Sequence, residues 1–271
     1  MTYDRAVVPS PRHRTFSALV VLIAVLAPAL SRAREPERFS AWPDDTALTL
    51  REHRIALGLS SQSAWGAHRR FDVRLHPLLF WVLPHVEVKV RWLDDGRWQL
   101  SSAHRVGYPT PFLSLVSREG SGGLLPPTTS VPHALSLDND VLGSAEWRDG
   151  QWATLRAGAA VAWVGSGDET VLDFPILYQR FAALYAPIVP RLSLVASGLV
   201  AERLSYNVEF KHYWLPLHDQ PLRHANEYFA EVYLRLGQNH RLGAGGRLSV
   251  ARLPVGLRSH FLPHLDYQFG F

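Results

Sequence analysis

Cysteine is absent from the 271 residues, and lysine occurs only twice, at Lys89 and Lys211. Without cysteine the chain cannot form a disulfide framework, a thiolate-ligated zinc or iron–sulfur site, a thiol nucleophile or a lipidated cysteine anchor. Charged residues make up only 19% of the chain and hydrophobic residues 47%, which excludes an intrinsically disordered protein. The composition therefore indicates a folded chain whose positive charge is almost entirely arginine.

The first 33 residues have the pattern of a cleaved export signal. Arginines in residues 1–14 precede an apolar stretch over residues 15–30, and Ser31 and Ala33 supply the small residues of a signal-peptidase site. A membrane-spanning anchor would need about 20 apolar residues, more than this stretch contains. Removing residues 1–33 takes away four arginines and one aspartate, so the formal net charge falls from +4 to +1. We therefore expect no nucleic-acid partner.

The remaining chain alternates apolar and polar residues. In residues 82–93, Val86 and Val88 share one face, while Glu87 and Lys89 share the other. Such alternation predicts strands with one apolar and one polar face, and hence an all-β fold. The candidate strands are residues 47–60, 67–77, 82–93, 97–108, 134–147, 151–165, 175–186, 191–203, 204–214, 228–236, 241–252 and 258–271.

The C-terminal segment alternates up to its last residue. Leu265, Tyr267, Phe269 and Phe271 fall on one face, and the chain stops on the aromatic Phe271. Together with the export signal, the charged strand faces and the tryptophans near strand ends, this segment resembles the terminal strand of bacterial outer-membrane β-barrels. A soluble β-sandwich or lipocalin-like barrel, with the apolar faces turned inward, is the alternative that periodicity alone leaves open.

The resemblance implies a transmembrane antiparallel up-and-down β-barrel in the outer membrane of a Gram-negative-type bacterium. Its expected partners are outer-membrane lipid and the barrel-insertion machinery, which reads Leu265, Tyr267, Phe269 and Phe271 as its signal. We expect residues 1–33 to be the signal peptide, residues 34–66 to hold a short helix or first strand, and residues 67–271 to form the barrel.

The strand number is expected to be even, at ten or twelve. The turns at residues 94–96 and 148–150 are Asp-Gly hairpins, and residues 109–133 form one long connection. Ten strands, with 191–214 as one strand and 46–59 outside the barrel, place the short turns in the periplasm and the long connection outside. Counting all twelve candidates reverses those positions, so ten is favoured over twelve.

The polar strand faces predict a lumen lined by both signs of charge. Two interpretations follow: a narrow channel with a transverse electric field, or a lumen closed by paired side chains. The residues expected to line the lumen are Arg70, Asp72, Arg74, Glu87, Lys89, Arg91, Asp138, Asp140, Glu209, Glu231 and Arg247.

Thirteen histidines raise the hypothesis of an enzyme acting on membrane lipid. Nucleophilic hydrolysis needs a serine, a base within hydrogen-bond reach and an acid that orients the base. His260, His264 and Asp266 share the inward face of the last strand, and Ser249 faces inward on the strand before it. These four residues are weak catalytic candidates, because the residue spacing matches no known barrel enzyme.

Metal-ligand spacings such as His-x-x-x-His on a helix are lacking from the sequence, so neither a metal nor a cofactor is expected. The leading hypothesis is a narrow outer-membrane channel for small solutes. The alternatives are a lipase- or deacylase-type barrel enzyme and a structural, receptor or envelope-biogenesis barrel with a plugged lumen.

Overall fold

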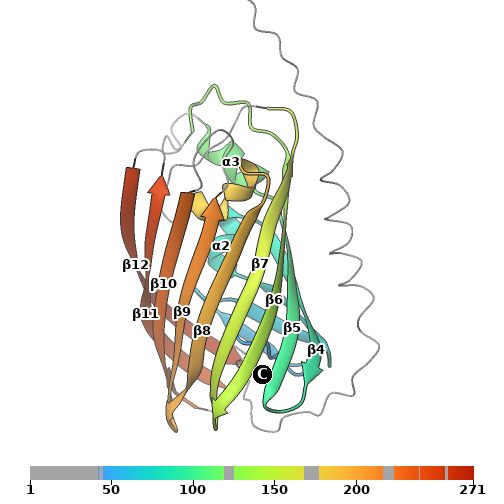
Figure 1. Ribbon diagram of the computed structural model, residues 1–271, viewed down its shortest axis with the longest axis vertical. Helices are drawn as coiled ribbons and strands as arrows, with labels where there is room; N and C mark the ends of the chain where they lie inside the picture. Colours follow the sequence, from blue (N-terminus) through green and yellow to red (C-terminus); the bar gives the residue numbers. More distant parts are fainter. Residues whose placement is uncertain are drawn as a thin grey trace, which may run out of the picture. The chain divides into compact units, whose positions relative to one another are not determined.

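The computed structural model describes seven stretches of the chain, and most of them belong to one β-barrel (Figure 1). The expected signal peptide lies outside the described residues, so its cleavage stays a prediction. The described residues are 42, 45–118, 125–167, 177–215, 223–237, 239–253 and 256–271.

Twelve antiparallel strands form a closed barrel in which each strand pairs with its neighbours in sequence and β1 pairs with β12. The all-β up-and-down fold predicted from the alternation is thus confirmed, with the larger of the two expected strand numbers. The strands are β1 (Ile55–Gly58), β2 (Ser63–His68), β3 (Phe71–Leu75), β4 (His85–Asp94), β5 (Trp98–Gly107), β6 (Ala134–Arg148), β7 (Gln151–Val164), β8 (Val189–Ala201), β9 (Leu204–Leu215), β10 (Arg223–Arg235), β11 (His240–Leu253) and β12 (Gly256–Gly270).

The preference for ten strands was wrong, because the structure differs from that arrangement at four places, one of which is residues 46–59, which were placed outside the barrel but contain β1. Residues 191–214 are not one strand, because the chain turns at Glu202 and Arg203 between β8 and β9. The candidate strand 175–186 instead contains short helices in its described part. Residues 63–75, which were assigned at most one strand, form the β2–β3 hairpin, so the twelve strands differ from the twelve candidates. The first strand begins at Ile55, within the segment where the sequence left a helix or a strand open.

The turns that follow β2, β4, β6, β8 and β10 lie at one end of the barrel, which we call the turn end (Figure 1). Gly96 and Gly150 have positive φ angles of 89° and 70°, as the predicted Asp-Gly hairpins require. Phe271 and Ile55 pair at the same end, where each backbone amide donates to the carbonyl of the other. The long connection between β5 and β6 lies at the opposite end, so the two Asp-Gly turns and this long connection are on opposite sides of the barrel, as expected, with twelve strands.

Short helices gather at that opposite end, which we call the helix end (Figure 1). No helix in the described part of the chain is long and apolar enough to cross a membrane. Pro77 begins the first of them, where a missing amide is tolerated, and His76 Nδ1 accepts a hydrogen bond from the Leu79 amide. The helices are α2 (Pro77–Val82), α3 (Thr110–Val116), α4 (Leu177–Arg180) and the 3₁₀ helix η2 (Ala182–Leu184).

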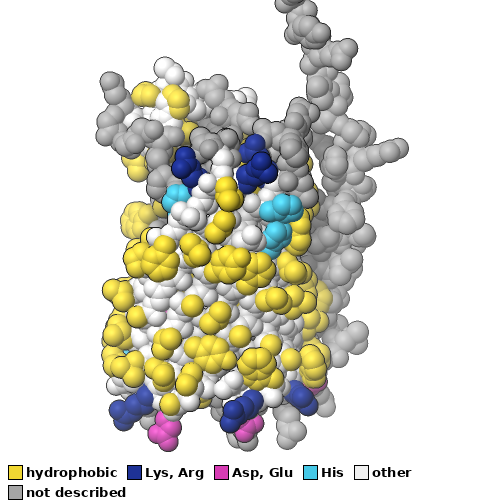
Figure 2. Space-filling model, turned by 60° about the vertical axis from the view of Figure 1, so that its left-hand side comes forward, with side chains coloured by type: hydrophobic (Ala, Val, Ile, Leu, Met, Phe, Trp, Pro, Cys, Tyr) yellow, Lys and Arg dark blue, Asp and Glu magenta, His cyan; other side chains and the backbone are white. Residues whose placement is uncertain are grey.

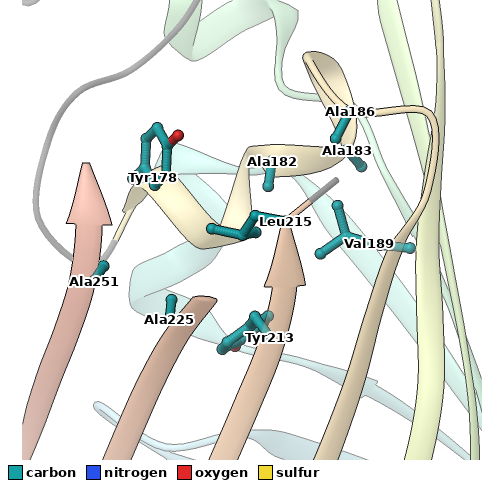
Figure 3. Close-up of a cluster of buried hydrophobic side chains, with 10 residues drawn as sticks. Tyr178, Ala182, Ala183, Ala186, Val189, Tyr213, Leu215, Ala225 and Ala251 are labelled. Carbon is teal, nitrogen blue, oxygen red and sulfur yellow. The ribbon is translucent and has the colours of Figure 1, made fainter. Parts of the chain in front are cut away.

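Buried apolar side chains join these helices to the strand ends. Tyr178 and Ala182 pack with Val189, Tyr213 and Leu215 of the barrel wall (Figure 3). A second cluster joins Leu83, which follows α2, with Leu113 and Val116 of α3, Leu125 and Phe181. The helix end therefore has a hydrophobic core inside the barrel. The apolar side chains on the outer face of the barrel are not part of this core.

The outer surface carries an apolar belt, as expected for strands facing lipid (Figure 2). Exposed side chains on this surface include Trp98, Trp147 and Trp163, each more than half exposed. Trp152, which was expected among the tryptophans near strand ends at the membrane interface, is instead buried with 2% exposure. It shares the inward face of β7 with the buried Thr154.

Candidate functional site

A segment without regular secondary structure, before the first strand, lies inside the barrel against β3, β4 and β6. The Ala47 amide donates a 2.7 Å hydrogen bond to Ser144 Oγ of β6, and the Leu50 amide donates a 2.8 Å bond to Asp72 Oδ2 of β3. Ala47, Leu48 and Leu50 are each at most 3% exposed. We call residues 45–50 the inner segment, and it fills part of the lumen.

Basic wall residues hold the inner segment by its backbone. Lys89 is fully buried, and its ammonium donates to the carbonyl oxygens of Thr46 and Leu48. Arg74 also donates to the Leu48 carbonyl and forms an ion pair with Asp72 at 2.6 Å. The carbonyl groups of Thr46 and Leu48 do not lie in a helix or a sheet that would pair them. The two cations therefore replace the water that would otherwise solvate these carbonyl groups.

Asp45 begins the inner segment and is held by the far wall. Its carboxylate accepts a 3.0 Å hydrogen bond from Asn207 Nδ2 of β9. Burial alone would raise the pKa of Asp45, but the nearby Lys211 and the Asn207 hydrogen bond outweigh it, so the pKa lies below the ordinary value. Asp45 is therefore ionised at neutral pH, and its charge attracts the inner segment to Lys211 on the far wall.

A cavity of about 640 Å³ is lined by the inner segment, the barrel wall and the helices of the helix end. Small-molecule sites have volumes in this range. Its charged lining is unequal, with eight basic side chains against four acidic ones. The basic residues are Arg74, Arg105, Arg156, Arg180, Arg191, Lys211, Arg241 and Arg247; the acidic residues are Asp45, Asp138, Glu209 and Glu231.

Several arginines that line the cavity pair with carboxylates that do not line it. Arg105 pairs with Glu87 at 2.7 Å, and the exposed fractions of the two side chains are 23% and 2%. Arg247 pairs with Glu227 at 2.7 Å, with exposed fractions of 23% and 1%. These two arginines are thus neutralised by carboxylates that do not line the cavity, and the charged groups that reach the cavity surface are mainly guanidinium groups, which favour an anion.

Two further clusters repeat this arrangement. Arg156 and Arg191 both pair with the carboxylate of Asp140, which is 3% exposed. Arg180, on α4, makes two hydrogen bonds to Glu227 of β10 at 2.5 and 2.8 Å, which ties the helix end to the wall. Multiple partners for one buried carboxylate fix the positions of the cations around the cavity.

Two buried amide groups offer further contacts to a ligand. Gln179 and Asn207 line the cavity and are each 2% exposed. Each has a carbonyl oxygen without a hydrogen-bond partner among the described residues. Buried polar atoms are nearly always satisfied, so a water molecule or a ligand with a donor group completes these sites.

Most of the expected lumen residues have inward-facing side chains. The exception is Arg70, which lies half-buried in the turn between β2 and β3, because residues 63–75 form a hairpin and not one strand. The inward residues are Asp72 and Arg74 of β3, Glu87, Lys89 and Arg91 of β4, Asp138 and Asp140 of β6, Glu209 of β9, Glu231 of β10 and Arg247 of β11.

The catalytic candidates do not assemble into a triad in the described part of the chain. Ser249 accepts a 2.9 Å hydrogen bond from Gln179, and Asp266 accepts one of 2.7 Å from the Ser60 amide. His264 lies 3.0 Å from the Ser60 carbonyl and 3.1 Å from Glu231. His260 is opposite Ser249 in the β11–β12 register, but no hydrogen bond between their side chains is found there. The geometry thus gives Ser249 no base.

Several residues of the cavity were not predicted. Arg105 could have been found, because it continues the inward face of residues 97–108. Arg180 and Gln179 could not, since their segment was interpreted as a strand. No sequence signal indicated that residues 45–50 enter the lumen. Among the described residues, no group of three or more metal-ligating side chains is close enough to hold an ion.

Comparisons with known proteins give the class of fold. No protein-family model matches the chain, and no curated protein matches it. The structure is similar to the COG4313 outer membrane channel from Pseudomonas putida F1, with a TM-score of 0.54 and 10% identity over 84% of this chain and 99% of that one. At this identity the similarity shows the fold alone.

Two other solved structures match less well. The KdgM porin in complex with disordered oligogalacturonate gives a TM-score of 0.41 at 7% identity, over 80% of this chain and 94% of that one. OmpT, an outer membrane protein of Vibrio cholerae, gives 0.41 at 9% identity over 77% of this chain. The match covers only 62% of the OmpT chain. The fold is that of the bacterial outer-membrane β-barrels, as the terminal strand predicted.

Proposed function

We propose that this protein is a narrow outer-membrane channel for small anionic solutes, held closed in the present conformation by the inner segment. The main support is the cavity, which is lined by eight basic and four acidic side chains, since carboxylates such as Glu87 and Glu227 pair with its arginines from outside the lining. A basic constriction raises the local concentration of anions and slows cations. The proposal combines the two interpretations of the lumen. The protein is a narrow channel, and in this conformation paired charges and the inner segment close it.

Passage through the barrel requires the inner segment to move. Its polar contacts with the wall are hydrogen bonds to Ser144, Asp72, Lys89 and Asn207, and Ala47 and Leu50 also pack in two small apolar clusters. The neutral bond to Ser144 contributes only about 0.5–1.5 kcal/mol net, and each bond that involves a charged group contributes about 1.5–3 kcal/mol. A segment held in this way can leave the lumen without unfolding the barrel.

The similarity to the COG4313 channel fits this proposal, since that protein is described as an outer membrane channel. It supplies the fold, whereas the anion preference rests on this chain's own arginines.

Planar-bilayer conductance of the refolded protein tests the proposal, with the heat-modifiable gel shift as a control for folding. The decisive variant is Ala47→Cys with Ser144→Cys, which can tether the inner segment because the chain has no other cysteine. We expect rare, small, anion-selective openings in the wild type and none in the oxidised variant. Reduction should restore them.

A second variant releases the segment. Lys89→Met removes both ammonium contacts to the inner segment, so openings should become at least tenfold more frequent. Silence from a folded Lys89→Met protein, or cation-selective openings, would overturn the proposed channel and favour a plugged structural barrel.

A further inference from the structure

The barrel wall has two very different heights. The strands β1, β2 and β3 have only four, six and five residues, whereas β4 to β12 have between ten and fifteen. At about 3.3 Å per residue, a six-residue strand spans about 20 Å before its tilt is considered. The three short strands therefore cannot close the wall at the helix end, and we call this side the low wall.

Above the low wall, the edge of β12 has no strand beside it in the described part of the chain. Strand pairing with β1 covers only Gln268, Phe269 and Gly270, and the β1–β2 loop adds contacts from Ser60 to Leu265 and Asp266. No strand in the described part of the chain pairs with residues 257–263 on that side. Pro263 lies on this edge, where its missing amide costs no ladder hydrogen bond.

The helix α2 lies beside this opening with apolar groups on two faces. Leu79 and Val82 pack against the buried cluster at the helix end, while Leu78 and Trp81 are 58% and 80% exposed. A six-residue helix with exposed apolar side chains is unfavourable in water but stable against hydrocarbon chains. These side chains indicate that lipid reaches this part of the wall.

The cavity extends to the same opening. Its lining includes Pro263 and Leu265 of β12, both exposed, and the exposed Leu78 of α2. Leu265 is on the outward face of its strand and is 75% exposed, yet it borders the same space as the lumen-facing Arg105 and Arg247. One cavity thus has an apolar mouth in the wall and a basic interior.

We propose that the gap between β12 and α2 is a lateral entrance, through which an amphipathic anion with a hydrocarbon chain passes between the membrane and the cavity. This inference rests on the proposed function, because it names the class of solute that the basic cavity takes. The apolar mouth, formed by Leu78, Leu262 and Leu265, contacts the hydrocarbon chain.

The interior suits the head group of such a molecule. Arg247 lies over the ring of Phe229 with 4.7 Å between the guanidinium carbon and the ring centroid. Its side chain is still 23% exposed, so it can bind an anion while it keeps its pair with Glu227. A neutral head group would lose the charge-assisted hydrogen bonds that the arginines offer.

The test uses the protein in lipid nanodiscs and 11-(dansylamino)undecanoate as the probe, with binding followed by energy transfer from tryptophan. The uncharged methyl ester of the probe is the head-group control. The decisive variant is Leu262→Asp, which puts a negative charge in the mouth. Leu257→Asp is the matched control, because Leu257 is on the same strand and 72% exposed but does not line the cavity.

We expect saturable binding of the carboxylate, at least tenfold weaker binding of the ester, and at least a tenfold loss in Leu262→Asp with no change in Leu257→Asp. Should Leu262→Asp fail the heat-modifiable gel shift, Leu262→Trp narrows the mouth without adding a charge. Equal affinity in the wild type and a folded Leu262 variant overturns the entrance, and so does an equal loss in both aspartate variants.

Chloride conductance separates this inference from the proposed channel. The conductance is measured in the Lys89→Met protein, which has no change in the apolar mouth. If the protein conducts chloride but probe binding does not depend on Leu262, only the lateral entrance is disproved. If probe binding depends on Leu262 but the protein does not conduct, the channel is disproved and a ligand site that opens to the membrane remains.

Discussion

The two ends of the barrel are closed by opposite kinds of interaction. Near the turn end, the inner segment is held by hydrogen bonds and buried charges from Lys89, Ser144 and Asp72. At the helix end, Tyr178, Phe181 and their neighbours form apolar clusters. Hydrogen bonds can be exchanged for water one at a time, whereas apolar packing is lost cooperatively. The first closure is therefore suited to opening and the second to holding shape.

Truncation of the apolar closure should have the largest effect. Phe181 is 2% exposed, and its ring lies 6.2 Å from that of Phe112. Phe181→Ala should cost about 3–5 kcal/mol of local stability, because the cavity left behind cannot be refilled. Limited proteolysis of residues 177–188 should show faster cleavage in the variant, with the Ala47 amide unchanged in hydrogen exchange. Equal exposure of both ends would mean that the two closures act as one unit.

Acid should loosen the helix end next, through His76. Burial, followed by the charges of His85 and Arg180, lowers the pKa of His76 from 6.5 to about 4. The folded state therefore prefers the neutral ring, so its contribution is complete above pH 6.5 and is lost as the pH falls towards 4. The expected loss is on the order of 2–3 kcal/mol.

Protonation would also remove the acceptor that His76 Nδ1 provides for the Leu79 amide at the start of α2. Hydrogen exchange of that amide should speed up between pH 6.5 and 4, after correction for intrinsic rates. In His76→Gln the added pH dependence should vanish. Unchanged protection of Leu79 across this range would contradict the role of the neutral ring.

The smallest effect is expected in the polar closure. Ser144→Ala removes the acceptor for the Ala47 amide and should weaken the inner segment by about 1 kcal/mol. Ser193→Ala is the matched control, because Ser193 is 1% exposed and its hydroxyl has no hydrogen-bond partner among the described residues. Hydrogen exchange at Ala47 should rise about fivefold in the first variant only. An equal rise in both would point to a general loosening of the wall.

Sequence alternation predicts the long strands β4–β12 better than it predicts the short strands β1–β3 of the low wall. Segments such as β4, β9 and β12 are long enough for a period of two to be recognised, and their charged faces do point inward. β1 has only four residues, too few for alternation to be recognised. The β2–β3 turn at Arg69 and Arg70 continues the alternation of residues 67–77, so the sequence gives no sign of a turn there. The same turn explains why Arg70 was placed in the lumen.

The candidate site was only partly predictable, for a physical reason. Alternation tells which face a residue occupies but not which distant residue lies opposite, so Ser249 and His264 share a lumen without meeting. Residues 177–184 contain apolar side chains that are buried on several sides, because their helices lie inside the barrel. A short apolar run of this kind has the same sequence pattern as a strand.

The pairing between β1 and β12 also affects the order in which the barrel folds. It joins Ala56 to Gly270, while the other strand pairs join neighbours along the chain. Contacts between residues so far apart form late, because the loop between them must first lose its freedom. Only three positions pair between β1 and β12 and only two between β1 and β2, so we expect β1 to be the last strand to close the barrel and the first to separate under strain.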